Sequence, residues 1–215
     1  GGIGISVGAA FAQLQEQGRV ICCFGEGATD QGLFWEAINY AALKQLPILF
    51  VCENNHYATY SSYDKRVANT DLVSKVSAFG IPSERIFGND VMAIYHSLSR
   101  ALQNIQAGPY FVEAMTYRLS SHVGPESDSY IYRKTEELEV WQELCPVKNL
   151  YNLINKYEPF DDSSVQASIE KEIDEAFIFA RSSSYPSVPN WEATNITNNE
   201  TLDLDSISSD YDSEF

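Results

Sequence analysis

The chain has 215 residues, enough for one α/β domain followed by a tail. Its composition, 44% hydrophobic and 20% charged, is that of a globular protein and excludes a chain that is disordered throughout. Thirty Asp and Glu against fourteen Lys and Arg give a net charge of −16, which disfavours binding to nucleic acid or anionic lipid. No apolar run approaches the roughly 20 residues of a membrane span. We therefore expect no nucleic acid and no membrane among its partners.

The predicted elements alternate between short apolar runs, typical of buried parallel strands, and longer helical patterns. In chain order they are a helix over 4–17, a strand over 20–24, a helix over 31–44, a strand over 47–52, helices over 71–79 and 91–106, and a strand over 110–115. Asp90 is the expected N-cap of the helix over 91–106. Strands that alternate with helices of this length predict an α/β fold with a right-handed, doubly wound parallel sheet.

The character of the chain changes after residue 118. Residues 120–130 form a polar stretch longer than a simple connection, so we expect a functional loop there. Amphipathic helices are predicted over 135–144, 147–157 and 163–181. Residues 191–215 carry seven Asp and Glu and no Lys or Arg. We therefore predict one α/β domain over 1–182 and a flexible acidic tail over 183–215.

The four cysteines show no spacing typical of a disulfide framework or a zinc site. Cys22, Cys23 and Cys52 lie in the apolar runs that predict strands, so we expect all three to be small core residues. This usage favours a reducing compartment such as the cytoplasm.

The first candidate site is the turn that follows the strand over 20–24. There the chain runs into Gly25-Glu26-Gly27-Ala28, at the carboxyl end of a parallel strand, where ligands of open α/β sheets bind. Outward-facing N–H groups of Gly27 and Ala28 suit a phosphate. Glu26 would repel that phosphate unless a cation lies between them, and Mg²⁺ fits because it binds carboxylate, carbonyl and phosphate oxygens together.

The second candidate site follows the next strand, in the segment Glu53-Asn54-Asn55-His56-Tyr57. An Asn side-chain oxygen and a backbone carbonyl are hard ligands that complete a Mg²⁺ site, provided that the two strands are neighbours. The alternative is that Gly25-Glu26-Gly27 is an ordinary strand–helix turn and Asn54-Asn55 a loop cap.

These two segments together resemble a known signature. Gly-Asp-Gly followed by Asn-Asn is the thiamine diphosphate motif, and this chain matches it with Glu in place of Asp. The wider sequence GEGATDQGLFWEAINYAALKQLPILFVCENNHYA resembles the α subunits of 2-oxo acid dehydrogenase E1 components of the pyruvate, acetoin and branched-chain types. The resemblance continues through FVEAMTYR and YRKTEELEVW and covers about residues 1–182. The resemblance implies that the front part of the family domain is missing from these 215 residues.

The resemblance implies a fold of the thiamine diphosphate-binding (PP-domain) type and two cofactors, thiamine diphosphate and Mg²⁺. It implies that Mg²⁺ is held by Glu26, the Asn55 side chain and the Tyr57 carbonyl. The residues expected at the cofactor are Gly25, Gly27, Ala28 and Asn55. His122, in the polar loop, matches the active-site histidine of the family, and a loop histidine can donate to phosphate or carry protons near neutral pH.

The implied activity is that of an oxidoreductase, the decarboxylation of a 2-oxo acid with transfer of the acyl group to an acceptor such as lipoamide. The resemblance further implies a β-type E1 subunit that supplies the pyrimidine domain and an activating Glu, an α₂β₂ heterotetramer that is inactive without it, and the lipoyl domain of an E2 component as a further partner. The compartment would be the cytoplasm, or the mitochondrial matrix in a eukaryote. Two alternatives stay open: a split transketolase-like or carboligating subunit, suggested by Trp35-Glu36-Ala37, and a catalytically inactive interaction subunit.

Overall fold

The computed structural model of the chain describes residues 1–123 and 132–185. These residues fall into two units, one spanning Gly1–Phe160 and one that starts at Asp161. Most of the predicted acidic tail, residues 186–215, lies outside the described residues, as do residues 124–131 of the polar loop. The boundary expected at residue 182 therefore stays a prediction.

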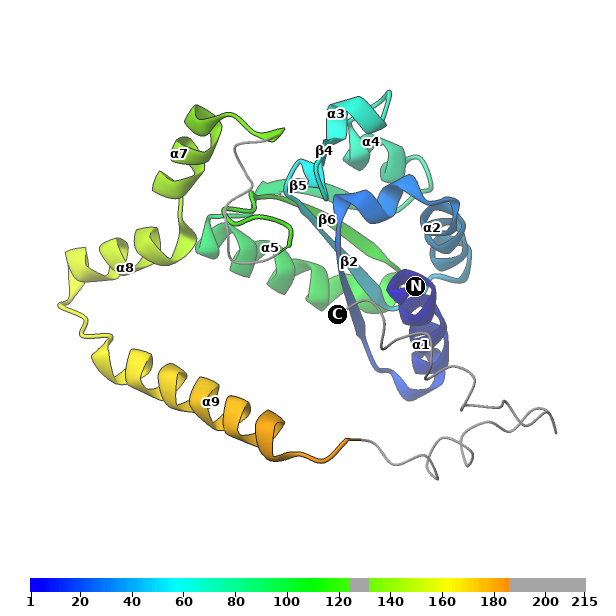
Figure 1. Ribbon diagram of the computed structural model, residues 1–215. Helices are drawn as coiled ribbons and strands as arrows, with labels where there is room; N and C mark the ends of the chain where they lie inside the picture. Colours follow the sequence, from blue (N-terminus) through cyan, green and yellow to red (C-terminus); the bar gives the residue numbers. More distant parts are fainter. Residues whose placement is uncertain (124–131, 186–215) are drawn as a thin grey trace, which may run out of the picture. The chain divides into compact units, whose positions relative to one another are not determined.

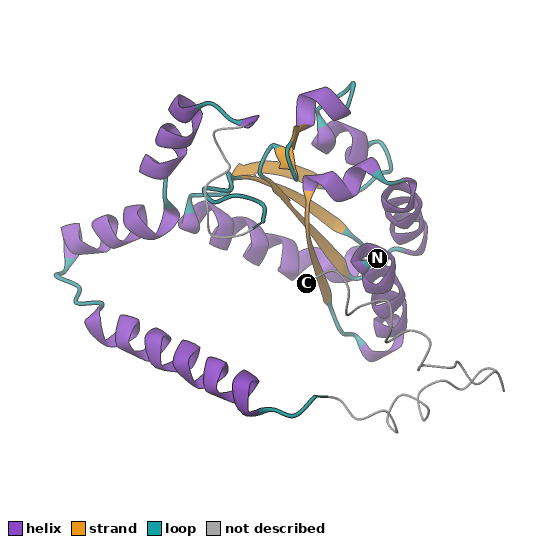
Figure 2. Ribbon diagram, in the orientation of Figure 1, coloured by secondary structure: helices purple, strands orange, loops and turns teal. Residues whose placement is uncertain are grey.

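A parallel sheet of four strands forms the centre of the first unit (Figures 1 and 2). The strands, in their order across the sheet, are β1 (Val20–Gly25), β2 (Ile48–Asn54), β6 (Tyr110–Met115) and β5 (Ser83–Phe87). A separate two-stranded hairpin follows β2 and consists of β3 (Tyr57–Ala58) and β4 (Ser61–Ser62). The parallel sheet confirms the predicted α/β fold.

Helices connect the strands and follow the sheet. They are α1 (Gly2–Glu16), η1 (Glu26–Asp30), α2 (Gly32–Lys44), α3 (Tyr63–Arg66), α4 (Leu72–Ser77), α5 (Val91–Asn104), η2 (Ile105–Ala107), α7 (Thr135–Glu143), α8 (Pro146–Tyr157) and α9 (Ser163–Ser182). Asp90 caps α5 as predicted, because its carboxylate accepts hydrogen bonds from the first-turn N–H groups of Met92 and Ala93, each at 3.0 Å.

Helices cover both faces of the sheet, so the sheet is doubly wound. Side chains alternate between the two faces of a strand, and on β2 Phe50 points to the face that packs against α1, α2 and α4. Its neighbours Leu49 and Val51 point to the face covered by α5. Burial on both faces explains why β2 is apolar over five successive positions. Each fully buried side chain of this kind stabilises the fold by about 1.5–3 kcal/mol.

One expectation about the sheet was wrong, and one strand was not predicted. Cys23 is exposed rather than buried, because it points to the α5 side of the edge strand β1, beyond the part of that face that α5 covers. Strand β5 was not predicted, because its sequence SERIF is mostly polar and its side chains are only partly buried. β5 lies at the edge of the sheet and pairs through its backbone on one side only. Its side chains are therefore less covered than those of a central strand, so its sequence does not need to be apolar.

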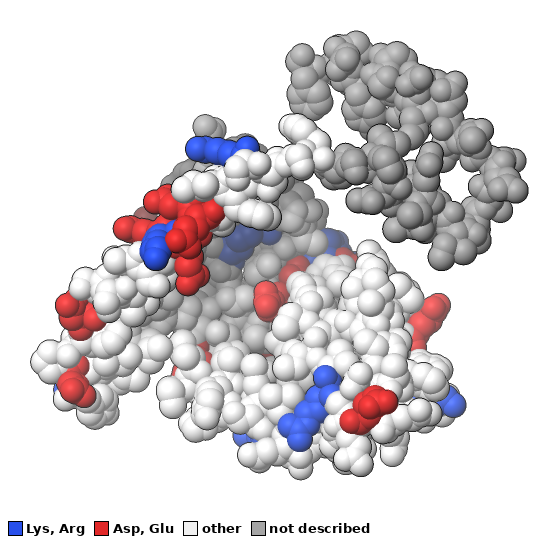
Figure 3. Space-filling model, turned by 90° about the horizontal axis from the view of Figure 1, so that it is seen from below, with Lys and Arg blue, Asp and Glu red and all other residues white. Residues whose placement is uncertain are grey.

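The second unit contains α9, whose ends agree with the predicted helix. Its apolar side chains Ile169, Ile173 and Phe177 stay 50–58% exposed, so this stripe is not part of a core within the described residues. No helix in residues 1–123 and 132–185 is long and apolar enough to cross a membrane. On the face drawn in Figure 3, the Lys and Arg side chains of the described residues are scattered and form no broad basic patch.

Candidate functional site

The carboxyl ends of β1 and β2 lie side by side. The two strands are parallel neighbours, and Gly25, the last residue of β1, is the Cα partner of Glu53 near the end of β2. The turn after β1 and the loop after β2 therefore leave the same edge of the sheet next to each other. This arrangement confirms the strand pairing on which the two-part candidate site depends.

Glu26 is the buried carboxylate of this edge, with an exposed fraction of 1%. It starts η1 directly after β1, and Arg66 of α3 donates from Nη2 to its Oε1 at 2.8 Å. Arg66 also forms an ion pair with Asp30 at the other end of η1. Burial raises the pKa of Glu26, and the Arg66 charge offsets only part of this effect, so the pKa stays above its ordinary value.

Arg66 is a site residue that the sequence did not reveal. It lies 40 positions after Glu26, in a segment without any motif, and only the hairpin β3–β4 and the short α3 turn it back toward η1. Arginine is the usual partner of a carboxylate that is removed from water, because it stays charged at any physiological pH.

The loop after β2 is shaped by its two asparagines. Asn54 Oδ1 accepts a hydrogen bond from the His56 N–H, and Asn55 Oδ1 accepts one from the Tyr57 N–H, both at 3.0 Å. His56 adopts a left-handed conformation with φ of 69°. These two successive Asx turns reverse the chain into the hairpin.

The hairpin packs against the turn after β1, and this contact explains one of the two glycines. A Cβ atom on Gly27 would lie 2.8 Å from the Cβ of Ala58 in β3, so position 27 has no room for a side chain. A Cβ atom on Gly25 would meet nothing within 4 Å. Close approach of η1 and β3 therefore requires glycine at position 27 but not at position 25.

The structure brings two of the three predicted Mg²⁺ ligands together. The Asn55 backbone lies close enough to the Glu26 carboxylate to lower its pKa in part, and Tyr57 lies two residues further along the same loop. A carboxylate, an amide oxygen and a backbone carbonyl form a donor set of hard oxygens, which fits Mg²⁺. The Asn55 oxygen already accepts one hydrogen bond, but an amide oxygen has a second lone pair. Arg66 bonds only to Oε1 of Glu26, so the other carboxylate oxygen, Oε2, is not used by this arginine.

No group of three or more His, Cys, Asp and Glu residues that could hold a metal ion occurs among the described residues. The predicted set contains only one such residue, Glu26, so this finding leaves the assignment untested. Binding of a diphosphate by Gly25, Gly27 and Ala28 likewise stays a prediction.

His122 is exposed and lies next to the tip of the hairpin. Arg118 connects the two, because its Nη1 contacts His122 Nδ1 at 3.0 Å and its Nη2 donates to the Thr59 carbonyl at 2.7 Å. Arginine can only donate, so Nδ1 must accept, and the neutral His122 ring carries its proton on Nε2. Thr59 directly follows Ala58, which touches Gly27, so the hairpin lies between His122 and the turn after β1. Arg118 is part of the FVEAMTYR motif, but the sequence indicated no role for it.

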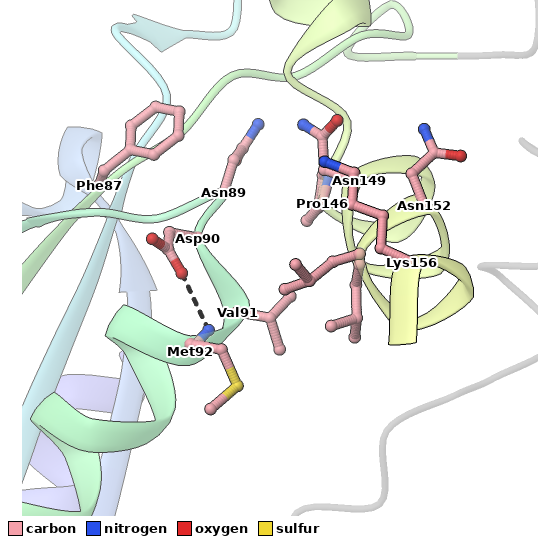
Figure 4. A pocket seen from close by; sticks show the side chains of 11 residues that line it. Phe87, Asn89, Asp90, Val91, Met92, Pro146, Asn149, Asn152 and Lys156 are labelled. Carbon is pink, nitrogen blue, oxygen red and sulfur yellow. Dashed lines mark hydrogen bonds between the residues drawn. The ribbon is translucent and has the colours of Figure 1, made fainter. Parts of the chain in front are cut away.

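A cavity of about 710 Å³ borders the hairpin and is lined by Tyr57 and Arg66 together with Lys65 and Lys134. Glu137 also lines this cavity, and Arg66 is already paired with Glu26 and Asp30, so Lys65 and Lys134 are the side chains there that can attract an anion at short range. Figure 4 shows a different cavity of about 700 Å³, between the start of α5 and α8. It contains none of the predicted site residues, and the Asp90 carboxylate in it is bonded to the N–H of Met92 as the cap of α5.

Comparison with known proteins identifies the class. The family model described as "Dehydrogenase E1 component" matches residues 2–189, so the chain belongs to the dehydrogenase E1 component family.

Three curated relatives show which members of the family it is similar to. The α subunit of the pyruvate dehydrogenase E1 component of Porphyra purpurea is 32% identical over 201 residues, which cover 87% of this chain and 58% of that protein. The α subunit of acetoin:2,6-dichlorophenolindophenol oxidoreductase of Bacillus subtilis (strain 168) is 30% identical over 192 residues, or 86% and 57% of the two chains. The α subunit of 2-oxoisovalerate dehydrogenase of the same strain is 37% identical over 146 residues, or 66% and 44%. The chain spans about half the length of the relatives it matches.

Proposed function

We propose that this chain is an E1 α-like subunit that binds thiamine diphosphate and Mg²⁺ and takes part in the decarboxylation of a 2-oxo acid. The observation that carries the proposal is the pairing of the buried Glu26 with the Asn55 loop at adjacent strand ends, in a chain of the dehydrogenase E1 component family. The relatives named above are pyruvate, acetoin and 2-oxoisovalerate enzymes, which supports a 2-oxo acid or a related acyl donor as the substrate class.

The roles of the residues follow from their chemistry. Glu26, the Asn55 side chain and the Tyr57 carbonyl would hold Mg²⁺, and the N–H groups of Gly27 and Ala28 would bind the diphosphate. Lys65 and Lys134, which line the cavity beside the hairpin together with Glu137, support an anionic ligand there. Bound thiamine diphosphate supplies the electron sink that decarboxylation of a 2-oxo acid requires. His122 would donate from Nε2 to a phosphate or substrate oxygen.

The activity is proposed for a complex with a β-type subunit. The relatives are named as α subunits, and such a name implies a second subunit. That partner would supply the pyrimidine domain and the activating Glu in an α₂β₂ assembly. The acyl group would pass to the lipoyl domain of an E2 component or to another acceptor.

Calorimetric titration of thiamine diphosphate, with and without Mg²⁺, into the chain in its complex tests the proposed site. We expect Mg²⁺-dependent binding that weakens at least about 10-fold in the Glu26→Gln variant. Glu16→Gln is the matched control, because it makes the same change at an exposed carboxylate of α1. Equal binding by the wild type and Glu26→Gln would contradict the assignment. Release of CO₂ from a 2-oxo acid, but not from a ketose phosphate, would separate a dehydrogenase from a transketolase-like enzyme.

One observation favours a second candidate, a catalytically inactive interaction subunit. Arg66 already neutralises Glu26 with a guanidinium at 2.8 Å, so a buried carboxylate has a partner without any metal ion. If this is the role of Arg66, the same titration shows no Mg²⁺ effect in the wild type. Arg66→Gln would then destabilise the chain, since it leaves the Glu26 charge buried and unpaired.

A further inference from the structure

A completely buried carboxylate lies in the middle of the sheet, next to the end of β2 where the candidate loop begins. Glu113 of β6 has an exposed fraction of 0%, and its Cα partners are Cys52 of β2 and Arg85 of β5. Oε2 accepts a hydrogen bond from Arg85 Nε at 2.7 Å, and Oε1 accepts one from Asn54 Nδ2 at 2.7 Å. A buried carboxylate is retained only when its oxygens are paired, and here both are used.

Asn54 connects Glu113 to the loop that follows β2. Its side chain, in a residue with an exposed fraction of 2%, is held at both ends, since Nδ2 donates to Glu113 and Oδ1 accepts from the His56 N–H. The direction of the amide is determined by chemistry, because a carboxylate can only accept here and an N–H can only donate. The bond to His56 also secures a left-handed backbone conformation, which is unfavourable for a residue other than glycine.

We infer that Glu113 is a positioning residue for the loop over residues 54–58. It orients the Asn54 amide, the amide holds the turn at His56, and the turn places the Asn55 backbone near Glu26 and Ala58 against Gly27. The consequence for Mg²⁺ binding rests on the proposed function, whereas the order of the loop does not. Glu113 acts through Asn54 and touches neither the predicted ligands nor the cofactor residues.

Asn54→Asp separates the two bonds of Asn54 with little change of shape. The new carboxylate keeps an oxygen for the His56 N–H, but it places a second oxygen against Glu113 Oε1 in place of the donor. We expect backbone amides of the loop to exchange with deuterium at least about 10-fold faster, measured by mass spectrometry on the chain in its complex. Mg²⁺ affinity in the presence of thiamine diphosphate should fall about 10- to 100-fold.

Two further variants keep the test decisive. Asn69→Asp makes the same substitution at an exposed Asx turn, where Asn69 Oδ1 accepts the Asp71 N–H at 3.0 Å, and it should change neither readout. Combining Asn54→Asp with Glu113→Gln exchanges donor and acceptor, because the new amide can donate to the new carboxylate while its oxygen still accepts from Arg85. This exchange should restore slow loop exchange and tight Mg²⁺ binding.

The outcomes separate this inference from the proposed function. If Asn54→Asp leaves loop exchange at the wild-type rate, or if a folded double variant does not restore it, Glu113 does not position the loop. If loop exchange responds as expected but the wild type binds no Mg²⁺, the positioning role stands and the proposed metal site is wrong.

Discussion

The close contact between η1 and β3 makes Gly27→Ala the sharpest test of the site geometry. The new Cβ would lie 2.8 Å from the Cβ of Ala58, whereas carbon atoms in contact are ordinarily about 3.5–4.0 Å apart. The two segments must therefore separate by about 0.7–1.2 Å. The Ala58 methyl group is attached directly to the backbone of β3 and cannot rotate away. We expect a loss of about 1–3 kcal/mol in the free energy of unfolding, the usual cost of overpacking.

Urea unfolding followed by far-UV circular dichroism measures this loss. Gly25→Ala is the matched control, because its Cβ meets nothing within 4 Å and its φ of −78° suits alanine. This control should be neutral or more stable by about 0.4–1 kcal/mol, since alanine has less freedom than glycine in the unfolded chain.

A double-mutant cycle with Ala58→Gly identifies the cause. Without the Ala58 methyl group, the nearest atom of that residue to the new Cβ of Gly27→Ala is the Ala58 Cα at 3.7 Å, an ordinary contact. Ala58→Gly alone should cost roughly 0.5–1 kcal/mol, but in the Gly27→Ala background it should recover most of the loss. Wild-type stability of Gly27→Ala, or additive losses in the double variant, would refute the packing that we describe.

Three further predictions concern charged groups of the first unit. Burial raises the pKa of Glu84, but hydrogen bonds such as the one from Ser97 Oγ at 2.8 Å outweigh it, so the pKa lies below its ordinary value. The ionised Glu84 carboxylate therefore stabilises the fold above its unfolded pKa. Ser97→Ala should cost roughly 1.5 kcal/mol in the free energy of unfolding at neutral pH. Urea unfolding at several pH values should show this cost shrinking as the pH falls through the folded pKa of Glu84. Burial and the Glu137 carboxylate raise the pKa of Tyr57 to about 12. Glu137→Gln should therefore lower this pKa, which NMR of labelled tyrosine measures. An unchanged pKa would show that burial alone is responsible. Asp90→Ala should destabilise the chain by about 1 kcal/mol in thermal or urea unfolding, whereas Asp90→Asn keeps the cap of α5; equal losses would contradict the capping role.

Local patterns were sufficient to predict much of this fold. The apolar runs of β2 and β6 identify strands that are buried on both faces, the run of β1 identifies an edge strand that is covered mainly on one face, and the N-cap Asp90 marks the start of α5. The turn around Glu26 and the Asn54-Asn55 pair could also be found, because each directly follows a strand and the carboxyl ends of neighbouring parallel strands meet at one edge. These features depend on residues that are close together in the chain.

The partners of these residues could not be predicted in the same way. Arg66 reaches Glu26 across 40 positions, and Glu113 reaches Asn54 across 59. Both contacts depend on the strand order β1-β2-β6-β5 and on the hairpin after β2, and the polar strand β5 that brings Arg85 to Glu113 has no apolar pattern of its own. Whether a polar side chain of this chain is solvated, paired or buried is decided by which strand becomes its neighbour. The identity of the neighbouring strand depends on the packing of the whole sheet. A buried charge has lost its water, so its stability depends on the partner that folding places beside it.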